Sequence, residues 1–221
     1  MTIRPASDRS LFISVGDQIS IQAHQSVVRL TGCLLGVRGI LNVHPAYTSV
    51  LVDFDPRLYT HAGVEALVRE QWAAHRDQAP AQPRVVEIPV RYGGEFGPDL
   101  PDVARHTGLT PERVIQLHAA ADYLVYFVGF STFFPYLGGL PPELATPRLS
   151  APRKHVPTGS VAIGGSQAGV YPLASPGGWR LIGRTWLPLF DLSSSPPPLL
   201  RMGDRVRFIA TLFNPTSEAG L

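Results

Sequence analysis

The chain has 221 residues, a formal net charge of +2 and a hydrophobic fraction of 44%. This length is enough for one large domain or two small ones, and the lack of any block of like charges leaves a nucleic-acid groove unsupported. No apolar run approaches the ~20 residues that a membrane span needs, and the N-terminus lacks the apolar core of a secretory signal. The single cysteine, Cys33, excludes an intramolecular disulfide and a cysteine-based zinc cluster, so we expect a cytosolic protein.

Residues 1–82 predict a small α+β domain. Apolar residues recur at helical spacing from Ile19 to Leu35, and Thr60 is placed to cap a second helix. Strands and helices are expected in the order β-α-β-β-α, at residues 11–15, 19–35, 39–44, 49–54 and 62–74. This order makes up most of a ferredoxin-like split βαβ domain, and residues 79–83, which include two prolines, are expected to form a linker.

Residues 83–221 predict a second domain. Asp99 is placed to cap a short helix that runs through Thr107, and Thr110-Pro111-Glu112 is a strong start signal for the next helix. Three strands are expected, at residues 85–90, 123–128 and 205–209. Residues 214–221 are expected to be a frayed tail.

Between Pro152 and Phe190 glycine and proline interrupt the chain densely. Glycine allows the backbone unusual angles or close approach, whereas proline removes a donor from a strand ladder. The pattern excludes a helix bundle and favours a tightly bent β-barrel or sandwich with rigid loops. Rigid loops that carry polar and aromatic side chains are where binding and catalysis usually lie.

Familiar catalytic signatures are absent from the sequence. It has no GxxxxGK[ST] phosphate loop, no HExxH zinc motif and no GxSxG nucleophile elbow. No GxGxxG follows an expected strand either. These absences remove the most recognisable enzyme classes without excluding an enzyme.

Two groups of charged residues are candidates for chemistry. His118 lies one helical turn before Asp122, which permits an Asp–His pair if the helix continues; otherwise His118 serves only to satisfy a helix end. Four cations lie within eight residues and are bracketed by prolines, so they are expected to converge on a carboxylate or phosphate, or else to form a solvated loop. They are Arg148, Arg153, Lys154 and His155.

Other residues have both a structural and a functional interpretation. Ser160, Ser166 and Gln167 lie among glycines whose amides suit an anion nest, although turn formation explains them equally well. A second set either lines a pocket or belongs to the core, and consists of Tyr171, Trp179 and Arg184. Cys33 is interpreted as a small buried apolar residue, and four phenylalanines are interpreted as core or interface: Phe127, Phe130, Phe133 and Phe134.

The motifs of the second half resemble one protein family. Residues 90–100, VRYGGEFGPDL, are similar to the VxYGGExGPDL element of the KipI/PxpB family, whose members are known as the 5-oxoprolinase B subunit or as allophanate hydrolase subunit 1. The N-terminal half agrees more weakly, mainly in residues 45–47 and 49–52. In the second half the match continues beyond residue 100, at residues 118, 126, 129–130, 135–140, 145–148, 152–153, 156–157, 159–161, 171–172, 175–179, 181–185 and 203–208.

The resemblance implies a ferredoxin-like domain at residues 1–82 and a cyclophilin-like β-barrel domain at residues 83–221. It implies pairing with a KipA-like (PxpC) subunit and a LamB/YcsF-like subunit for the ATP-dependent opening of 5-oxoproline, a cyclic amide, to glutamate. ATP chemistry would normally bring Mg²⁺, and we expect no turnover by the isolated chain. Two alternatives remain open: a KipI-type inhibitor of a sensor histidine kinase, or an accessory half of a urea or amide carboxylase.

Within the enzyme hypothesis each candidate side chain has an expected role. Cations would stabilise a developing phosphoryl charge, polar groups and backbone amides would hold the lactam oxygen, and a histidine would carry protons. The expected cations are Arg148, Arg153, Lys154 and Arg184. The expected substrate-binding residues are Ser160, Gln167, Tyr171 and Trp179, and the expected proton carriers are His118 or His155.

Three segments depart from the family pattern, at four positions. The usual Pro-Gly-Phe is here Thr132-Phe133-Phe134, which we expect to reshape a pocket wall. The usual Gln-Thr-Gly is here Gln167-Ala168-Gly169, with the loss of a hydroxyl expected near a ligand. Thr48 stands where an arginine is common. We therefore leave the substrate open.

Overall fold

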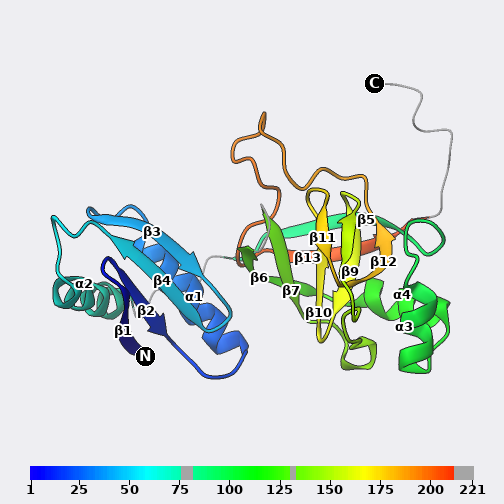
Figure 1. Ribbon diagram of the computed structural model, residues 1–221, viewed down its shortest axis with the longest axis horizontal. Coiled ribbons are helices and arrows are strands. Elements are labelled where there is room, and N and C mark those ends of the chain that lie inside the picture. Colours follow the sequence, from blue (N-terminus) through cyan, green and yellow to red (C-terminus); the bar gives the residue numbers. More distant parts are fainter. Residues whose placement is uncertain (76–81, 130–132, 212–221) are drawn as a thin grey trace. The chain divides into compact units, whose positions relative to one another are not determined.

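The computed structural model describes residues 1–75, 82–129 and 133–211. The chain divides into two compact units, Met1–Gln82 and Pro83–Leu221 (Figure 1). Most of the expected linker, together with Phe130, Thr132 and the expected tail at residues 214–221, lies outside the described residues. Within the described ranges, no helix is both long and apolar enough to cross a membrane.

The first unit is an antiparallel sheet with the strand order β1-β2-β4-β3 and two helices. Its elements in chain order are β1 (Thr2–Ser7), β2 (Ser10–Ser14), α1 (Ile21–Leu34), β3 (Ile40–Pro45), β4 (Ser49–Phe54) and α2 (His61–Ala74). The five elements from β2 to α2 confirm the expected order, and Thr60 accepts a hydrogen bond from the Gly63 N–H as the cap of α2.

Strand β1 was not expected, and it changes the connectivity of the sheet. A split βαβ domain ends with a strand after its second helix, whereas the additional strand of this unit precedes the first helix and pairs with β2. Most β1 side chains are exposed and Pro5 interrupts its sequence, so no apolar alternation marks the strand. Proline is tolerated there because β1 lies at the edge of the sheet.

One face of this sheet carries the core of the first unit. Leu11 and Ile13 on β2 alternate with polar or half-buried neighbours, as do Val50 and Val52 on β4. The buried stripe of α1 includes Val27, Leu30 and Leu34, and Ser20 caps this helix by accepting a hydrogen bond from the Ala23 N–H. The period of two in the strands and of 3.6 in the helices thus meets in one apolar layer.

The second unit is built on a closed barrel with the strand order β10-β7-β6-β13-β5-β12-β9. The barrel strands among the described residues are β5 (Val85–Tyr92), β6 (Tyr123–Gly129), β7 (Phe134–Gly138), β9 (Ser160–Gly164), β10 (Gln167–Val170), β12 (Arg180–Arg184) and β13 (Arg205–Ala210). Strands β8 (Arg153–Val156) and β11 (Ser175–Gly177) form a separate two-stranded ribbon. The unit also contains helices α3 (Leu100–Thr107) and α4 (Pro111–Ala120) and the short turn of 3-10 helix Pro142–Leu144. The barrel expected from the sequence is therefore confirmed.

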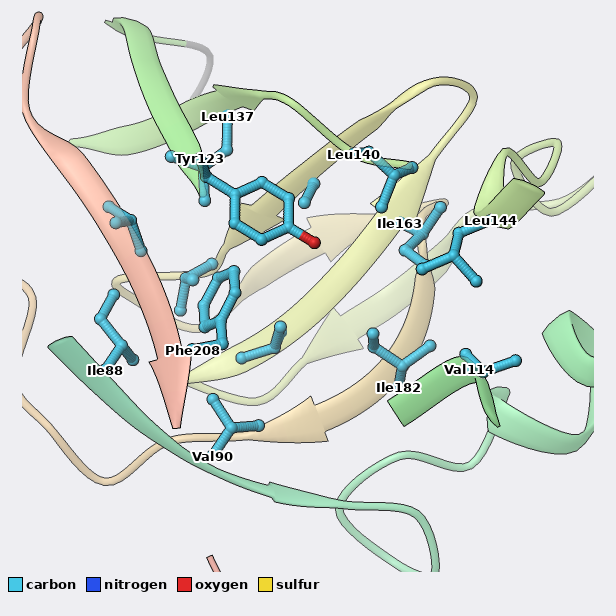
Figure 2. Packing of buried hydrophobic residues seen from close by; sticks show 14 of the residues in the cluster. Ile88, Val90, Val114, Tyr123, Leu137, Leu140, Leu144, Ile163, Ile182 and Phe208 are labelled. Atoms are coloured by element: carbon cyan, nitrogen blue, oxygen red, sulfur yellow. The ribbon is translucent and has the colours of Figure 1, made fainter. Parts of the chain in front are cut away.

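The barrel interior is filled by side chains from every barrel strand (Figure 2). Tyr123 and Phe208 occupy its centre, with Ile88, Leu137 and Ile182 around them, and each is at most 1% exposed. Helices α3 and α4 close one end with Val103 and Val114. Because the interior is packed, a ligand site must lie at the loops or on the outer face of the barrel.

Candidate functional site

An aromatic pocket lies on the outer face of the barrel. On β9, Val161 and Ile163 point into the barrel, whereas Ala162 between them packs against the aromatic residues outside. The pocket has a volume of about 60 Å³. We call it the outer pocket; it is lined by Phe134, Tyr136, Arg148, Tyr171, Gly177, Gly178 and Trp179.

Two glycines allow the rings to lie close to the sheet. A Cβ atom on Gly164 would come within 2.4 Å of the Trp179 ring, and one on Gly169 within 2.6 Å of the Phe134 ring. The rings of Phe134 and Trp179 meet edge to face with centroids 5.3 Å apart. This arrangement stabilises the aromatic set because edge-to-face contact is a favoured geometry. The glycines of this region therefore serve close packing.

Arg148 stands at the rim of the outer pocket on a fixed backbone. Its guanidinium carbon lies 5.4 Å from the centroid of the Trp179 ring, a cation–π contact. The residues on both sides are held: Thr146 pairs with Gly165, and the Leu149 N–H donates to the Gly178 carbonyl at 2.7 Å. Within the described part of the chain, Arg148 has no ion pair and no hydrogen bond. Its positive charge is thus uncompensated.

The other expected arginines are committed to the protein itself. Arg153 donates to the Asp99 carboxylate at 2.6 Å, and Arg184 donates to the Thr158 carbonyl at 2.9 Å. Arg184 does not line the outer pocket, so its expected place beside Tyr171 and Trp179 is wrong. Lys154 and Arg153 follow one another on β8 and hence project to opposite faces of the ribbon. The four cations therefore do not converge on one point.

Asp99 links three segments through its side chain. It is the N-cap residue of α3, which ends at Thr107 as expected, but its side chain makes no capping hydrogen bond. One carboxylate oxygen accepts from Arg153, and the other accepts from the Leu181 N–H at 2.7 Å. Asp99 is 4% exposed, which makes loss of either partner costly. It thus ties the β8 ribbon to β12 beneath the outer pocket.

Two arginines, Arg148 and Arg153, act electrostatically on Tyr171. Burial raises the pKa of the Tyr171 hydroxyl, and a backbone hydrogen bond with Trp179 and the positive charges of Arg148 and Arg153 oppose that rise. Arg148 acts in the same way on the pKa of Tyr136, which burial also raises. Both tyrosines line the outer pocket and stay neutral at physiological pH. The pocket therefore combines neutral hydroxyls with one free cation.

His118 lies in the barrel core and does not pair with Asp122. Helix α4 ends at Ala120, and Asp122 instead accepts from Arg207 at 2.6 Å. His118 is fully buried; its Nδ1 shares a hydrogen bond of 2.8 Å with the Tyr92 hydroxyl. Burial lowers the pKa of His118 to about 3, so the ring is neutral. The expected Asp–His pair is wrong, because the helix stops before it forms.

The expected anion nest is a hairpin turn. Ser160 is 2% exposed and its hydroxyl donates to the Pro157 carbonyl at 2.7 Å. Gln167 pairs with Gly164 across the β9–β10 hairpin, so Gly165 and Ser166 form its two-residue turn. None of these residues lines the outer pocket, whereas Tyr171 and Trp179 do. Turn formation, the structural interpretation, is the one that the geometry supports.

Two of the departures from the family pattern are now located. Phe134 keeps its place in the wall of the outer pocket, while Phe133 stacks on Phe190 with centroids 4.5 Å apart. Phe133 has a φ of 61°, the left-handed conformation that suits the glycine usual at this position. Ala168 is fully buried in the barrel interior, so a hydroxyl there would not reach the pocket. The expected ligand contact at that position is wrong.

Three residues of the pocket lie in the family motifs but were not assigned to the site from the sequence. Tyr136 alternates with Leu137 on β7 and stacks on Phe127 at 4.6 Å. Gly177 and Gly178 immediately precede Trp179 in a Gly-Gly-Trp run. Cys33 lies on α1 and is half-buried rather than buried as expected; this partial burial raises the pKa of its thiol.

A second hollow of about 400 Å³ lies beside the Ser–Pro segment 191–198. Arg84 lines it, but this arginine pairs with Asp204 at 2.6 Å and also donates to the Leu199 carbonyl. Arg201 also lines this hollow, and the side chains of the neighbouring segment 191–198 are mostly exposed. The outer pocket is the better candidate site because its free cation and its rings are held by the barrel.

Comparison with known proteins places this chain in a family. Residues 1–200 match the family described as the carboxyltransferase domain, subdomain C and D. The 5-oxoprolinase B subunit of Haemophilus influenzae is 44% identical over 215 residues, covering 95% of this chain and 97% of that protein. That of Bacillus subtilis is 41% identical over 220 residues, covering 94% and 91%. The chain therefore belongs to the family of 5-oxoprolinase B subunits, which the sequence resemblance had indicated.

Solved structures share the fold of this chain. The protein TTHA0988 superposes with a TM-score of 0.83 at 38% identity over 93% of this chain, which spans 40% of that protein. The urea carboxylase of Kluyveromyces lactis has a TM-score of 0.74 at 20% identity and is covered to 22% of its length. At that identity the second likeness shows a shared fold alone.

Proposed function

We propose that this chain is a component of an ATP-dependent 5-oxoprolinase that opens the lactam of 5-oxoproline to give glutamate. The observation that supports the proposal best is the identity of 41–44% to proteins named as the B subunit of 5-oxoprolinase, over more than nine-tenths of this chain and of the relatives from two bacteria. The partners would be a KipA/PxpC-like subunit and a LamB/YcsF-like subunit. The barrel would then be of the cyclophilin-like type and the first unit of the ferredoxin-like type.

The outer pocket suits a small substrate. Its volume of about 60 Å³ admits part of a small molecule, and its aromatic walls and single free cation resemble the usual lining of small-ligand sites. Ring opening adds water across the amide bond: the hydroxyl goes to the carbonyl carbon and the proton to the nitrogen. The residues of this chain would hold and orient the cyclic amide for that step.

ATP does not fit the outer pocket, which is too small for a nucleotide. Among the residues that the structure describes, no group of three His, Cys, Asp or Glu side chains is arranged to hold a metal ion. We therefore assign ATP and Mg²⁺ to the assembled complex and route no step of this chain through them.

The side-chain roles follow from which groups are free. Arg148 is free at the rim of the outer pocket, and Lys154 and His155 are exposed on β8. Lys154 would meet a developing negative charge, and His155 would carry a proton, once a partner covers this edge. Arg153 would act by orienting the site, since Asp99 holds it. The buried His118 would serve the barrel core.

The test is reconstitution of the complex from this chain, the KipA-like subunit and the LamB/YcsF-like subunit of the same organism. We expect ATP hydrolysis that depends on 5-oxoproline and releases glutamate, and we expect it to stop when any one component is omitted. A stably assembled complex that forms no glutamate would overturn the proposal. Turnover by this chain alone would overturn the requirement for partners.

A carboxylase role is the second candidate because the matching family is described as a carboxyltransferase domain. In that case the chain would transfer a carboxyl group from a biotin-bearing partner to an amide. Two preparations separate the candidates: 5-oxoproline turnover by the complex above without biotin supports the first proposal, whereas carboxylation of urea after addition of a biotin-bearing carboxylase partner supports the second.

A further inference from the structure

Arg148 is exposed at the rim of the outer pocket, and its guanidinium group has no ion pair or hydrogen bond within the described protein, so it is available to a ligand. Nearby arginines all have a partner: Arg153 pairs with Asp99, and Arg180 donates both to Asp102 and to the Pro147 carbonyl. None of the residues that line the outer pocket is acidic. Arg148 also acts electrostatically on the two tyrosine hydroxyls of the pocket. An anion placed between these groups would therefore meet an unneutralised positive charge.

The position of Arg148 is set before any ligand arrives. Arg180 holds the carbonyl of the preceding residue at 3.2 Å, and the next residue, Leu149, is bonded to Gly178 in the pocket wall. The Trp179 ring supports the guanidinium group from below. Pre-organisation of this kind reduces the entropy lost on binding, so one contact contributes more than it would on a free side chain.

Shape and chemistry select the kind of anion. An arginine offers paired donors in one plane, which match the two oxygens of a carboxylate. The pocket lining contains one cation and flat aromatic walls, and its volume of about 60 Å³ corresponds to a small planar group. A terminal phosphate carries more charge and is usually held by several cations or by a run of backbone amides. The described lining offers neither.

We propose that Arg148 and the outer pocket form a subsite for the carboxylate of a small cyclic or flat ligand. The carboxylate accepts paired hydrogen bonds from Arg148, and the apolar part of the ligand lies against Trp179 and Tyr136. The inference rests on the proposed function for the ligand's identity, 5-oxoproline, whose ring bears one carboxylate. Arg148 is in this account a substrate-binding residue, which replaces the role in phosphoryl stabilisation expected from the sequence.

The first test measures kinetics of the reconstituted complex. Arg148→Ala should raise KM for 5-oxoproline roughly 10- to 100-fold, as loss of a charge-assisted pair does, with a much smaller change in kcat. Arg148→Lys should recover part of the loss because it keeps the charge without the fork. Arg113→Ala, which removes the same charge from an exposed position on α4, is the matched control and should leave KM unchanged. An unchanged KM for Arg148→Ala would overturn the subsite while leaving the proposed function intact.

The second test follows the indole N–H resonance of Trp179 in the full chain, assigned by its loss in Trp179→Phe. We expect 5-oxoproline to shift it in the wild-type chain and not in Arg148→Ala, and we expect 2-pyrrolidinone, the same lactam without a carboxylate, to have little effect. An equal shift by 2-pyrrolidinone or by inorganic phosphate, or no shift by 5-oxoproline at all, would overturn the subsite. A wild-type shift together with an inactive complex would keep the subsite and reject the proposed function.

Discussion

The barrel holds two aromatic groups with opposite roles. The inner group consists of the buried His118, Tyr123 and Phe208 and the partly buried Tyr92, and its rings meet with centroids 4.7 to 5.6 Å apart. The outer group, Phe134, Tyr136, Tyr171 and Trp179, has a similar spacing of 5.0 to 5.9 Å but surrounds a pocket with a cation at its rim. Ring geometry alone does not separate structure from function.

The two groups differ in whether a charged side chain stands beside them: the inner group contains the neutral His118, whose Nε2 has no hydrogen-bond partner among the described residues, and the outer group has Arg148. Inside, the Tyr123 hydroxyl donates to the His118 carbonyl and the Tyr92 hydroxyl pairs with the His118 ring. Outside, Arg148 has no partner in the described protein. Arg148 is exposed and fixed beside the hollow by its backbone and by the Trp179 ring, so its guanidinium group is available to a ligand, whereas the neutral polar atoms of the inner group are not.

The largest expected effect is on the inner group. Phe208→Ala should lower the free energy of unfolding by about 3–5 kcal/mol, because it leaves a cavity among Tyr123, His118 and their neighbours. Urea unfolding of the full chain measures it. Ile209→Ala is the control: the adjacent side chain points the other way, is 42% exposed, and should change stability by less than about 1 kcal/mol. Equal losses for the two variants would contradict the burial of Phe208 in the inner group.

The second largest expected effect is the part of the loss of folding stability on acidification that comes from His118. Above about pH 6.5 its ring is neutral in both states. Below that pH the unfolded chain gains a proton that the folded barrel refuses until its pKa of about 3, so stability falls as pH falls. The loss should reach roughly 2 kcal/mol by pH 5. His118→Gln, which does not titrate, should lack this component, and parallel stability curves for the two proteins would refute it.

The smallest effect concerns the turn before β7. Phe133 keeps a φ of 61°, where a side chain costs about 1–2 kcal/mol and glycine costs little. Both Phe133→Ala and Phe133→Gly lose the stack on Phe190, but only glycine relieves the backbone. The glycine variant should therefore be more stable than the alanine variant by about 1 kcal/mol in urea unfolding.

The same pair of substitutions at Gln116 is the control for this turn. Gln116 lies exposed in α4, where alanine should be the better residue by about 1 kcal/mol. If alanine were also the better residue at Phe133, the left-handed backbone would not be a source of strain.

Much of the fold follows from local signals in the sequence. Thr60 and Thr110 cap the expected helices, and β4 lies at the expected residues because its apolar and polar side chains alternate. Strand β1 was missed because its mostly exposed side chains carry no such alternation. The carboxylate of Asp99 was assigned to the nearest helix, whereas its partner Arg153 lies far along the chain. Local spacing in the sequence does not reveal a contact between residues as far apart along the chain as Asp99 and Arg153.

The candidate site was predicted in part for the same reason. Tyr171, Trp179 and Arg148 were recognised from residue type and from the glycine-rich surroundings. Their assembly into one pocket depends on the pairing of β9, β10 and β12 and on the β8–β11 ribbon, which no local pattern specifies. Ser160 and Arg184 looked equally suitable, and only the structure shows that each is bonded to a nearby carbonyl.

The position of β13 has a consequence for how the chain is made. This strand, the last in the described sequence, lies between β5, to which it runs parallel, and β6. The barrel therefore cannot close during synthesis until residue 210 has left the ribosome, and until then the edges of β5 and β6 stay unpaired. Closing a barrel by pairing strands so far apart in the sequence is slow. Nascent chains of this protein are therefore expected to need chaperones that prevent aggregation until β13 emerges.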